Sequence, residues 1–283
     1  MKTEKEKCRI VRAPVRIDFA GGSTDIHPVS EMGGSVLNAA INKYVIGKLV
    51  VSGKRAGLEY HADVPTSSGL GTSGAMTLVW LYLISKIENK IKLAEMVRKI
   101  EEAMGIMGGK QDQYAAALGG INFLEFNNNN VKVERLKLKR QTIEELEKSL
   151  VLYYTGEHYS SDINKNIVED FRKGKNVESL LRIKEIAREM RNALLKNDIY
   201  KIPELMNFEF EERKKLHKKV ANKKIEDAIR IAFKNGASGA KICGAGGGGS
   251  LLFYCSDKKK LLKKLKCWEF KFDFEGLKVI RAC

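Results

Sequence analysis

The sequence predicts a two-domain α+β fold, because strand-like and helix-like stretches are both abundant and do not alternate regularly. Residues 9–19 alternate and are rich in β-branched side chains, which is typical of a strand. Residues 161–235 are almost all amphipathic helix, a clear change from the mixed first half. We therefore place the boundary near residue 148, with an N-terminal domain over 1–148 and a C-terminal domain over 149–283.

Short runs of β-branched and aromatic residues, broken by Gly, Pro or Asn, predict the strands of the first half. These expected strands are 9–19, interrupted at Pro14, then 34–51, 57–62, 121–126 and 131–138. Apolar residues that recur every three or four positions predict the helices, which are 73–86, 92–104 and 111–118. We expect Trp80 and Tyr114, on the first and third of these helices, to lie in the core.

The second half opens with a strand at 150–154, which follows a polar segment at 141–148. After the helical region, the chain closes with strand-like runs around a glycine loop and a lysine-rich helix. The expected strands are 239–243, 250–255, 268–274 and 277–282, and the expected helix is 258–266. We see no internal repeat at the periods typical of solenoids.

The chain is basic, with 51 Lys and Arg against 35 Asp and Glu and a net charge of +16. Its lysines lie mostly on helices and are interleaved with acids, as at 184–191 and 209–219. This pattern is typical of solvated helix faces, so we do not expect a nucleic-acid partner. The same positive field would favour an anionic substrate such as a nucleotide.

Cysteine and histidine usage argues against a structural zinc site, because the five Cys show no Cys-x-x-Cys spacing and the four His are scattered. We expect the thiols to be reduced. No apolar run is long enough to span a bilayer and no secretory signal is evident, so we expect a cytoplasmic protein without a membrane partner. The sequence leaves open whether the protein forms a homodimer.

A glycine-rich segment at 65–75 precedes the first apolar helix and is the best candidate for a phosphate site. Glycines allow a backbone to approach a ligand closely, Thr72 or Ser73 can cap the helix, and free N–H groups at a helix start attract anions. The chain lacks Gly-x-x-x-x-Gly-Lys-Ser/Thr, which excludes a Walker site. Gly-x-Gly-x-x-Gly occurs twice, but neither copy belongs to the βαβ unit of a dinucleotide site.

Three motifs follow one another in a specific order, and they are Arg12–Asp25, Pro65–Ala75 and Lys241–Ser250. Together they resemble the GHMP kinase superfamily of galactokinase, homoserine kinase, mevalonate kinase and phosphomevalonate kinase. Residues 108–123 and 154–156 are similar to the branch that includes D-glycero-D-manno-heptose 7-phosphate kinases. The resemblance covers nearly the whole chain. It implies an N-terminal domain like domain 2 of ribosomal protein S5 and a ferredoxin-like C-terminal domain.

This resemblance implies that the protein uses ATP and Mg²⁺. The residues that would bind ATP are Pro65, Ser67, Ser68, Gly69, Leu70, Gly71, Thr72, Ser73 and Gly74. Ser73 and Glu101 would ligate Mg²⁺, since hydroxyl and carboxylate oxygens suit this hard cation. Glu102, next to Glu101, is an open alternative for the carboxylate ligand.

The resemblance also assigns catalytic and substrate-binding residues. Asp112 matches the catalytic aspartate, which accepts or orients the proton of the attacking hydroxyl. Arg16 matches the basic residue that pairs with that aspartate and counters phosphate charge. The implied substrate-binding residues are Gly22, Thr24 and Asp25 in the first motif and Gly246 and Gly247 in the third.

One position departs from the heptose kinase pattern. Where those kinases tend to read Thr-Gly-x-x-Arg, this chain has Tyr159 in place of the Arg after Thr155-Gly156. An Arg at this position could grip an anionic group on the sugar. The departure leaves open whether the acceptor carries a phosphate.

We therefore expect an ATP-dependent kinase that transfers the γ-phosphoryl group to a hydroxyl of a sugar or sugar phosphate. The alternative within the superfamily is a kinase for a non-sugar alcohol such as mevalonate or pantoate. The alternative of another class is a non-catalytic nucleic-acid or regulatory binding protein on the same fold. The joint presence of Arg16, Ser73 and Asp112 argues against that alternative, because a pure binder has no need of them.

Overall fold

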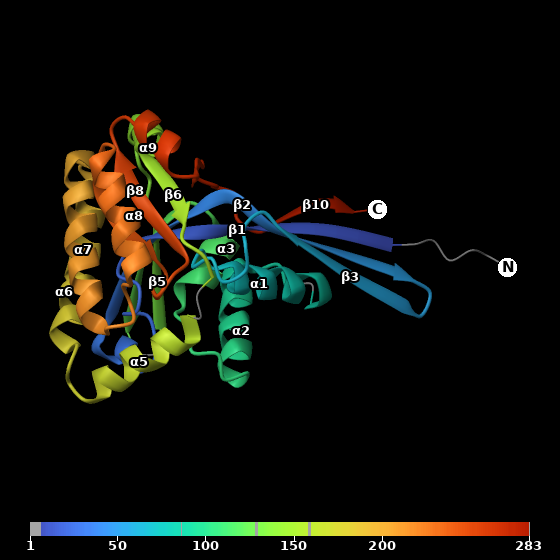
Figure 1. The fold of residues 1–283 in the computed structure, drawn as a ribbon. Helices are drawn as coiled ribbons and strands as arrows, with labels where there is room; N and C mark the ends of the chain where they lie inside the picture. The colour runs from blue at the N-terminus through green and yellow to red at the C-terminus, as the bar shows by residue number, and fades with distance from the viewer. Residues whose placement is uncertain (1–6, 86, 128–129, 158–159, 283) are drawn as a thin grey trace.

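The computed structural model describes residues 7–85, 87–127, 130–157 and 160–282. Its larger sheet has six antiparallel strands in the order β10-β1-β2-β4-β5, with β3 paired to β2 (Figure 1). The strands are β1 (Lys7–Ala20), β2 (Gly34–Ser52), β3 (Arg55–Ala62), β4 (Ile121–Asn127), β5 (Asn130–Arg135) and β10 (Lys278–Ala282). A short 3₁₀ helix, η1 (Val29–Met32), lies between β1 and β2.

Strand β1 is continuous through Pro14, where the sequence suggested a break between two strands. The register with β2 shifts between Pro14 and Val15, so the proline is accommodated at an irregularity rather than ending the strand. This continuity matters for the site, because β1 carries Arg16 and Asp18 in one rigid element.

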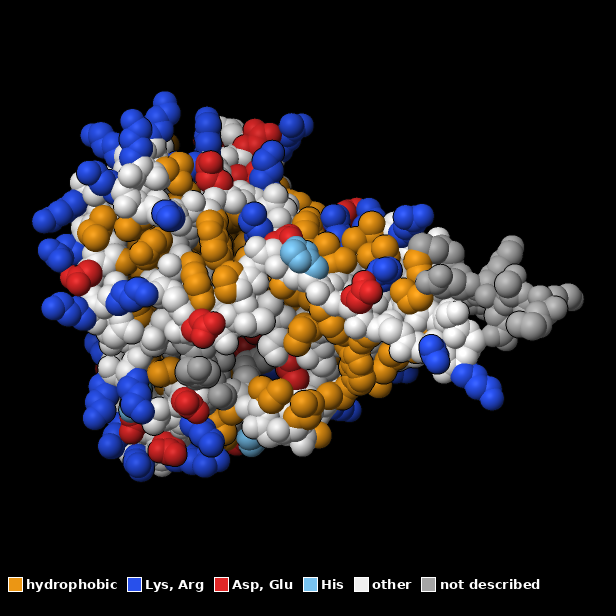
Figure 2. Space-filling model, turned by 45° about the vertical axis from the view of Figure 1, so that its right-hand side comes forward, with side chains coloured by type: hydrophobic (Ala, Val, Ile, Leu, Met, Phe, Trp, Pro, Cys, Tyr) orange, Lys and Arg blue, Asp and Glu red, His pale blue; other side chains and the backbone are white. Residues whose placement is uncertain are grey.

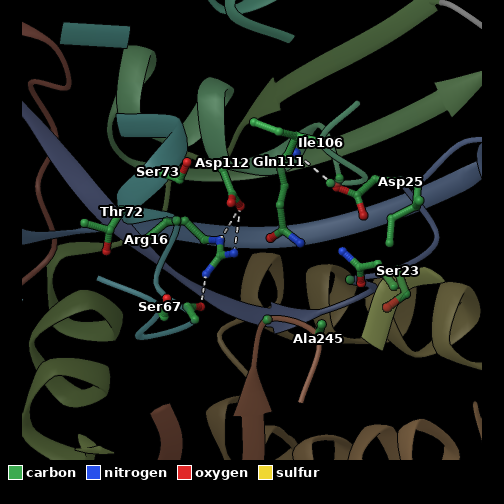
Figure 3. A pocket seen from close by; sticks show the side chains of 18 of the residues that line it. Arg16, Ser23, Asp25, Ser67, Thr72, Ser73, Ile106, Gln111, Asp112 and Ala245 are labelled. Carbon is green, nitrogen blue, oxygen red and sulfur yellow. Dashed lines mark hydrogen bonds and ion pairs between the residues drawn. The ribbon is translucent and has the colours of Figure 1, made fainter. Parts of the chain in front are cut away.

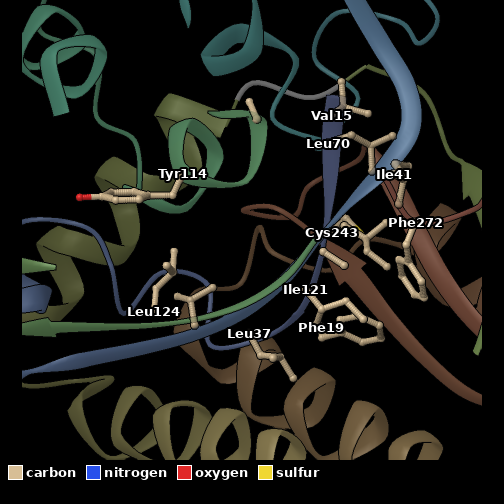
Figure 4. Packing of buried hydrophobic residues seen from close by; sticks show 14 of the residues in the cluster. Val15, Phe19, Leu37, Ile41, Leu70, Tyr114, Ile121, Leu124, Cys243 and Phe272 are labelled. Carbon is tan, nitrogen blue, oxygen red and sulfur yellow. The ribbon is translucent and has the colours of Figure 1, made fainter. Parts of the chain in front are cut away.

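Helices α1 (Thr72–Ser85), α2 (Lys90–Ala103) and α3 (Gln111–Leu118) pack together, and α1 and α3 contact β1 and β2. Tyr114 is buried, as expected, whereas Trp80 is 37% exposed, so the expectation of a core Trp80 is wrong. Helix α1 is apolar around most of its circumference, and its outward positions therefore carry exposed apolar side chains. Figure 4 shows buried side chains of β1, β2 and α3 in the same core.

A second sheet has four antiparallel strands in the order β7-β8-β6-β9. Its strands are β6 (Leu150–Tyr154), β7 (Ala237–Cys243), β8 (Ser250–Cys255) and β9 (Cys267–Trp268). The remaining helices are α4 (Arg140–Ser149), α5 (Ser160–Arg172), α6 (Val177–Leu195), η2 (Ile199–Lys201), α7 (Ile202–Leu216), α8 (Lys223–Lys234) and α9 (Lys259–Lys264). These two sheets with their helices confirm the expected α+β class.

In this half, a segment with no predicted element is helical and one expected strand is much shorter. The polar segment after residue 140 forms α4, whose Leu146 is buried. The strand expected over 268–274 is reduced to the two residues of β9 plus an isolated bridge between Ile41 and Phe272. That bridge directs the chain toward the first sheet, where β10 pairs with β1.

The two sheets are therefore interlocked. Strand β10 comes from the end of the chain yet completes the first sheet (Figure 1), and α6 contacts β1 and β2. The boundary near residue 148 remains a prediction.

No helix among the described residues is both long and apolar enough to cross a bilayer. Cys243, Cys255 and Cys267 are free thiols, but Cys8 is disulfide-bonded, which corrects the expectation of reduced thiols at that position.

The basic side chains are spread over the surface and mixed with acids, most densely on the part built from the C-terminal helices (Figure 2). Many are paired one helical turn away, as are Arg188 with Glu185, Lys214 with Glu211 and Arg230 with Asp227. This arrangement agrees with solvated helix faces.

Candidate active site

A cavity of about 420 Å³ lies where the three glycine-rich motifs meet (Figure 3). Its lining comprises Arg16, Gly22, Ser23, Asp25, Ile26, Ser67, Ser68, Gly69, Gly71, Thr72, Ser73, Gly105, Ile106, Gly108, Gly109, Gln111, Asp112, Asn164, Gly244 and Ala245. Segments far apart in the sequence thus share one polar pocket.

The glycine loop before α1 packs directly against Asp112. A Cβ at Gly71 would lie 3.1 Å from Asp112 Cγ, and one at Gly74 would lie 3.0 Å from Asp112 Cβ. Gly71 also has φ +74°, a conformation that L side chains rarely adopt. Helix α1 begins at Thr72, so Thr72 and the exposed Ser73 lie in its first turn rather than acting as N-caps. The loop and this helix start line the same cavity as Asp112, and free N–H groups at a helix start favour anions.

Arg16 joins the loop to the acid. Its Nε donates to Asp112 Oδ1 at 2.8 Å, its Nη2 lies 2.7 Å from the same oxygen, and its Nη1 donates to the Gly69 carbonyl at 2.5 Å. Burial lowers the pKa of Arg16, but the carboxylates of Asp112 and Asp18 outweigh burial and raise it, so the guanidinium stays charged. The expected pairing of Arg16 with Asp112 is therefore present.

Asp25 is almost fully buried at the opposite side of the cavity from the loop (Figure 3). Its Oδ2 accepts the backbone N–H of Gln111 at 3.0 Å. Burial raises the pKa of Asp25 to about 6; the Gln111 hydrogen bond opposes this shift, and the negative charges of Asp112 and Asp18 add to it. A Cβ at Gly109 would lie 2.1 Å from Asp25 Oδ2, so only glycine permits this contact.

Glu101 lies on α2 next to this cavity and lines an adjoining one of about 440 Å³. Its carboxylate accepts a hydrogen bond from Gln113 Nε2. Burial, followed by the charge of Asp112, raises the pKa of Glu101 to about 7. Glu102 is half exposed and pairs with Arg98 instead. Of the two acids, Glu101 is therefore the one near Asp112.

Some predicted residues do not line the cavity. Thr24 is buried, and its hydroxyl is engaged with Gly21 and Ser35, so it shapes the loop. Pro65, Leu70 and Gly74 are also absent from the cavity lining; Pro65 is exposed, whereas Leu70 and Gly74 are buried. Gly246 and Gly247 pack on Val220, to whose carbonyl the Gly247 N–H donates at 2.7 Å. In the third motif, Gly244 and Ala245 line the cavity in their place.

The third motif touches the glycine loop directly. A Cβ at Gly244, where φ is +82°, would lie 3.1 Å from the Gly69 carbonyl oxygen. The motif is also held by Thr155, whose hydroxyl donates to the Gly249 carbonyl at 2.9 Å. Tyr159, the departure from the heptose kinase pattern, lies outside the described residues.

A buried charge network lies beneath the first motif. It consists of Asp18, Glu209, Arg213 and Lys241, none of which is exposed to solvent. Arg213 pairs with Glu209 and donates to the carbonyls of Gly22 at 3.1 Å and Gly244 at 3.2 Å. The network links the first motif, the third motif and α7.

Sequence reasoning missed this network, and it also missed Gln111 and Asn164 in the cavity wall. Asp18 lies in the first motif and Lys241 in the third, so their position in these motifs could have indicated a role near the site. The sequence does not distinguish Arg213 and Glu209 from the other charged residues of α7, because acids and bases alternate along this helix.

The glycine loop, the Arg16–Asp112 pair and the cavity that they share are the parts that a small-molecule phosphotransferase needs. Comparison with protein families matches residues 36–120 to the GHMP kinases N terminal domain and residues 190–272 to the GHMP kinases C terminal domain. The chain belongs to the GHMP kinases. It is therefore an ATP-dependent kinase that acts on a hydroxyl group.

Several known proteins are similar over nearly the whole chain. The D-glycero-alpha-D-manno-heptose 7-phosphate kinase of Campylobacter jejuni is 29% identical, with 94% of this chain and 97% of that protein covered. The crystal structure of a D-glycero-D-manno-heptose 1-phosphate kinase from Bacteroides thetaiotaomicron matches with TM-score 0.76 and 25% identity, covering 96% and 98% of the two chains. That of a putative sugar kinase from Campylobacter jejuni matches with TM-score 0.72 and 27% identity, covering 97% and 98%.

Proposed function

We propose that the protein transfers the γ-phosphoryl group of ATP to a hydroxyl of a sugar or sugar phosphate. The observation that carries this proposal is the position of Asp112, which pairs with Arg16 on the wall of a cavity shared by the glycine loop and by Asp25. A nucleotide on the loop and an acceptor near Asp25 would both lie beside Asp112. The names of the similar heptose and sugar kinases support a sugar acceptor.

In this mechanism the acceptor hydroxyl attacks the γ-phosphorus, its proton is directed to Asp112, and the bond from that phosphorus to the bridging oxygen breaks, which releases ADP. Arg16 holds the Asp112 carboxylate in place and adds positive charge near the transferred group. The N–H groups at the start of α1 and in the loop bind the phosphates of the nucleotide.

We propose that Ser73 and Glu101 hold Mg²⁺. The donor set fits this ion, because the Ser73 hydroxyl is exposed at the cavity, and because Glu101 is a buried carboxylate close enough to Asp112 for their charges to interact. Mg²⁺ prefers few protein oxygens together with phosphate oxygens and water, and it neutralises phosphate charge when bound.

The test is an ADP-release screen over heptose 7-phosphate, common hexoses, deoxy sugars, mevalonate and pantoate, with Asp112→Asn as the inactive control. We expect ADP release that depends on a sugar or sugar phosphate. Activity confined to mevalonate or pantoate would refute the sugar acceptor and leave the kinase assignment standing. Salt-sensitive binding of mixed nucleic acid at low-micromolar affinity, without ADP release, would favour a binding protein.

A further inference from the structure

We propose that Gln111 is a substrate-binding residue that acts with Asp25 to accept hydrogen bonds from two neighbouring hydroxyl groups of the phosphoryl acceptor. The inference rests on the proposed function of the same cavity. It adds a specificity-determining residue that neither the motifs nor the family match assigns, and it narrows the acceptor to a compound that carries a diol.

Two unsatisfied acceptors distinguish these residues from the rest of the cavity wall. Within the described residues, eleven buried side-chain N or O atoms lack a hydrogen-bond partner. Only Gln111 Oε1 and Asp25 Oδ1 among them belong to residues that line the cavity. Gln111 is 4% exposed and Asp25 is 1% exposed, so both sites are shielded from bulk solvent. Buried acceptors without donors are costly, and those at a cavity wall are ones that a ligand can satisfy.

The backbone of Gln111 holds the Asp25 carboxylate in place, and both residues line the cavity that Asp112 lines. The Gln111 N–H donates to Asp25 Oδ2 at 3.0 Å, which leaves Asp25 Oδ1 unused. Asn38 Nδ2 donates to the Gln111 carbonyl at 3.3 Å and fixes the first turn of α3 from below. Gln111 is adjacent to Asp112 in the chain, and Figure 3 shows both side chains extending from α3 toward the cavity.

Glycines provide the space that these side chains need. A Cβ at Gly22 would lie 3.2 Å from Gln111 Nε2, and a Cβ at Gly109 would lie 2.1 Å from Asp25 Oδ2. The terminal torsions of carboxylates and amides are soft, so a small rotation turns either oxygen toward a ligand. The pair is thus preorganised in position and adjustable in direction.

The chemistry of the pair selects the ligand. Both unused atoms are acceptors, so the matching ligand must present two donors, and neighbouring hydroxyl groups of a polyol do so. A carboxylate or phosphate at this point would instead place a second negative charge beside buried Asp25, which is unfavourable. The hydroxyl that reacts at Asp112 is therefore expected to belong to a molecule with a further diol close to it.

The test uses Gln111→Met, which keeps the approximate length of the side chain but removes its hydrogen-bonding groups. Gln141→Met, the same change at an exposed position on α4, is the matched control. Dissociation constants for mannose, glucose and heptose 7-phosphate are measured by calorimetry. For the sugar bound most tightly by the wild type, we expect Gln111→Met to weaken binding by about tenfold or more and Gln141→Met to leave binding unchanged.

A measurement on the wild-type protein alone does not depend on how the variants fold. Singly deoxygenated forms of the best-bound sugar are compared with the parent, and we expect at least two of them to bind about tenfold more weakly. Three results would overturn the proposal. They are binding of every deoxy form as tightly as the parent sugar, binding of the sugar by Gln111→Met as tightly as by the wild type, and no saturable binding of any sugar. Gln111-dependent sugar binding without ADP release would refute the proposed kinase reaction and leave the diol site intact.

Discussion

Lys241 Nζ lies 3.3 Å from Asp18 Oδ1, and neither side chain is exposed to solvent. The same ammonium donates to the Asp18 carbonyl at 2.8 Å. Although burial favours the neutral acid, Lys241, Arg213 and Arg16 together lower the pKa of Asp18, so the carboxylate is charged in the folded protein. The third motif is thus tied to the strand that carries Arg16, and the two motifs are held together across the two sheets.

Lys241→Met should therefore be strongly destabilising. The change leaves the Asp18 carboxylate buried with less compensation, which typically costs about 3 to 5 kcal/mol. Urea denaturation gives the free energy of unfolding of each protein. Lys201→Met, which removes an exposed pair with Asp198, is the control and should leave stability nearly unchanged. In a double-mutant cycle, Asp18→Asn should cost less in the Lys241→Met background than in the wild type. Strict additivity would show that the pair does not interact.

Asp112→Asn should lower kcat by about 10² to 10⁴-fold, because the amide keeps the shape of the side chain but cannot take the proton of the acceptor hydroxyl. ATP binding, which relies on the loop, should persist. Steady-state kinetics measures the change in kcat, and fluorescence titration with a nucleotide analogue measures nucleotide binding. Asp227→Asn, the same change at a partly exposed position on α8, should be neutral. A near wild-type rate in Asp112→Asn would remove Asp112 from the mechanism.

Glu101→Gln should raise the Mg²⁺ concentration that gives half-maximal rate by about tenfold, since loss of one carboxylate ligand weakens a hard-cation site. Glu102→Gln is a matched control one residue away, and we expect little change because Glu102 pairs with Arg98. Rates are measured against free Mg²⁺ at saturating ATP. If only Glu102→Gln shifted the Mg²⁺ dependence, the ligand assignment would pass to Glu102.

Asp25 should impose a pH dependence near its raised pKa of about 6. Only the deprotonated carboxylate accepts hydrogen bonds on both oxygens, so kcat/KM for the acceptor should rise as pH increases from 5 to 7 and then level off. Asp25→Asn should lower kcat/KM and abolish this rise. A rise that persists unchanged in Asp25→Asn would assign it to another group.

The same shift predicts the opposite trend for stability. Because the folded state holds the Asp25 proton up to a pH of about 6 and the unfolded chain releases it near pH 4, the folded state binds more protons in this window. The contribution of Asp25 to the free energy of unfolding therefore decreases as pH rises from 4 to 6. Comparison of wild type and Asp25→Asn by denaturation across that range isolates this contribution. An identical pH profile for the two proteins would contradict it.

Much of the fold could be predicted from local patterns. Strands such as β6 and β8 and helices such as α3 follow from residue periodicity and glycine breaks, which act within a few residues. Predictions were less accurate where long-range packing decides the outcome. The aromatic residues of the 268–274 segment predict a strand, but most of the segment serves as the connection by which β10 reaches β1.

The sequence by itself determined which chemistry-bearing residues this protein has and the order of its three glycine-rich motifs. The family resemblance implied that Arg16 pairs with Asp112, and this pair is present in the structure. Only the tertiary structure decided that Asp25 and Gln111 share a cavity with that pair, and that Gly244, rather than Gly246 or Gly247, lines it. Hydrogen-bond satisfaction and burial depend on contacts between segments far apart in the chain, such as Asp18 and Lys241, which no local pattern encodes.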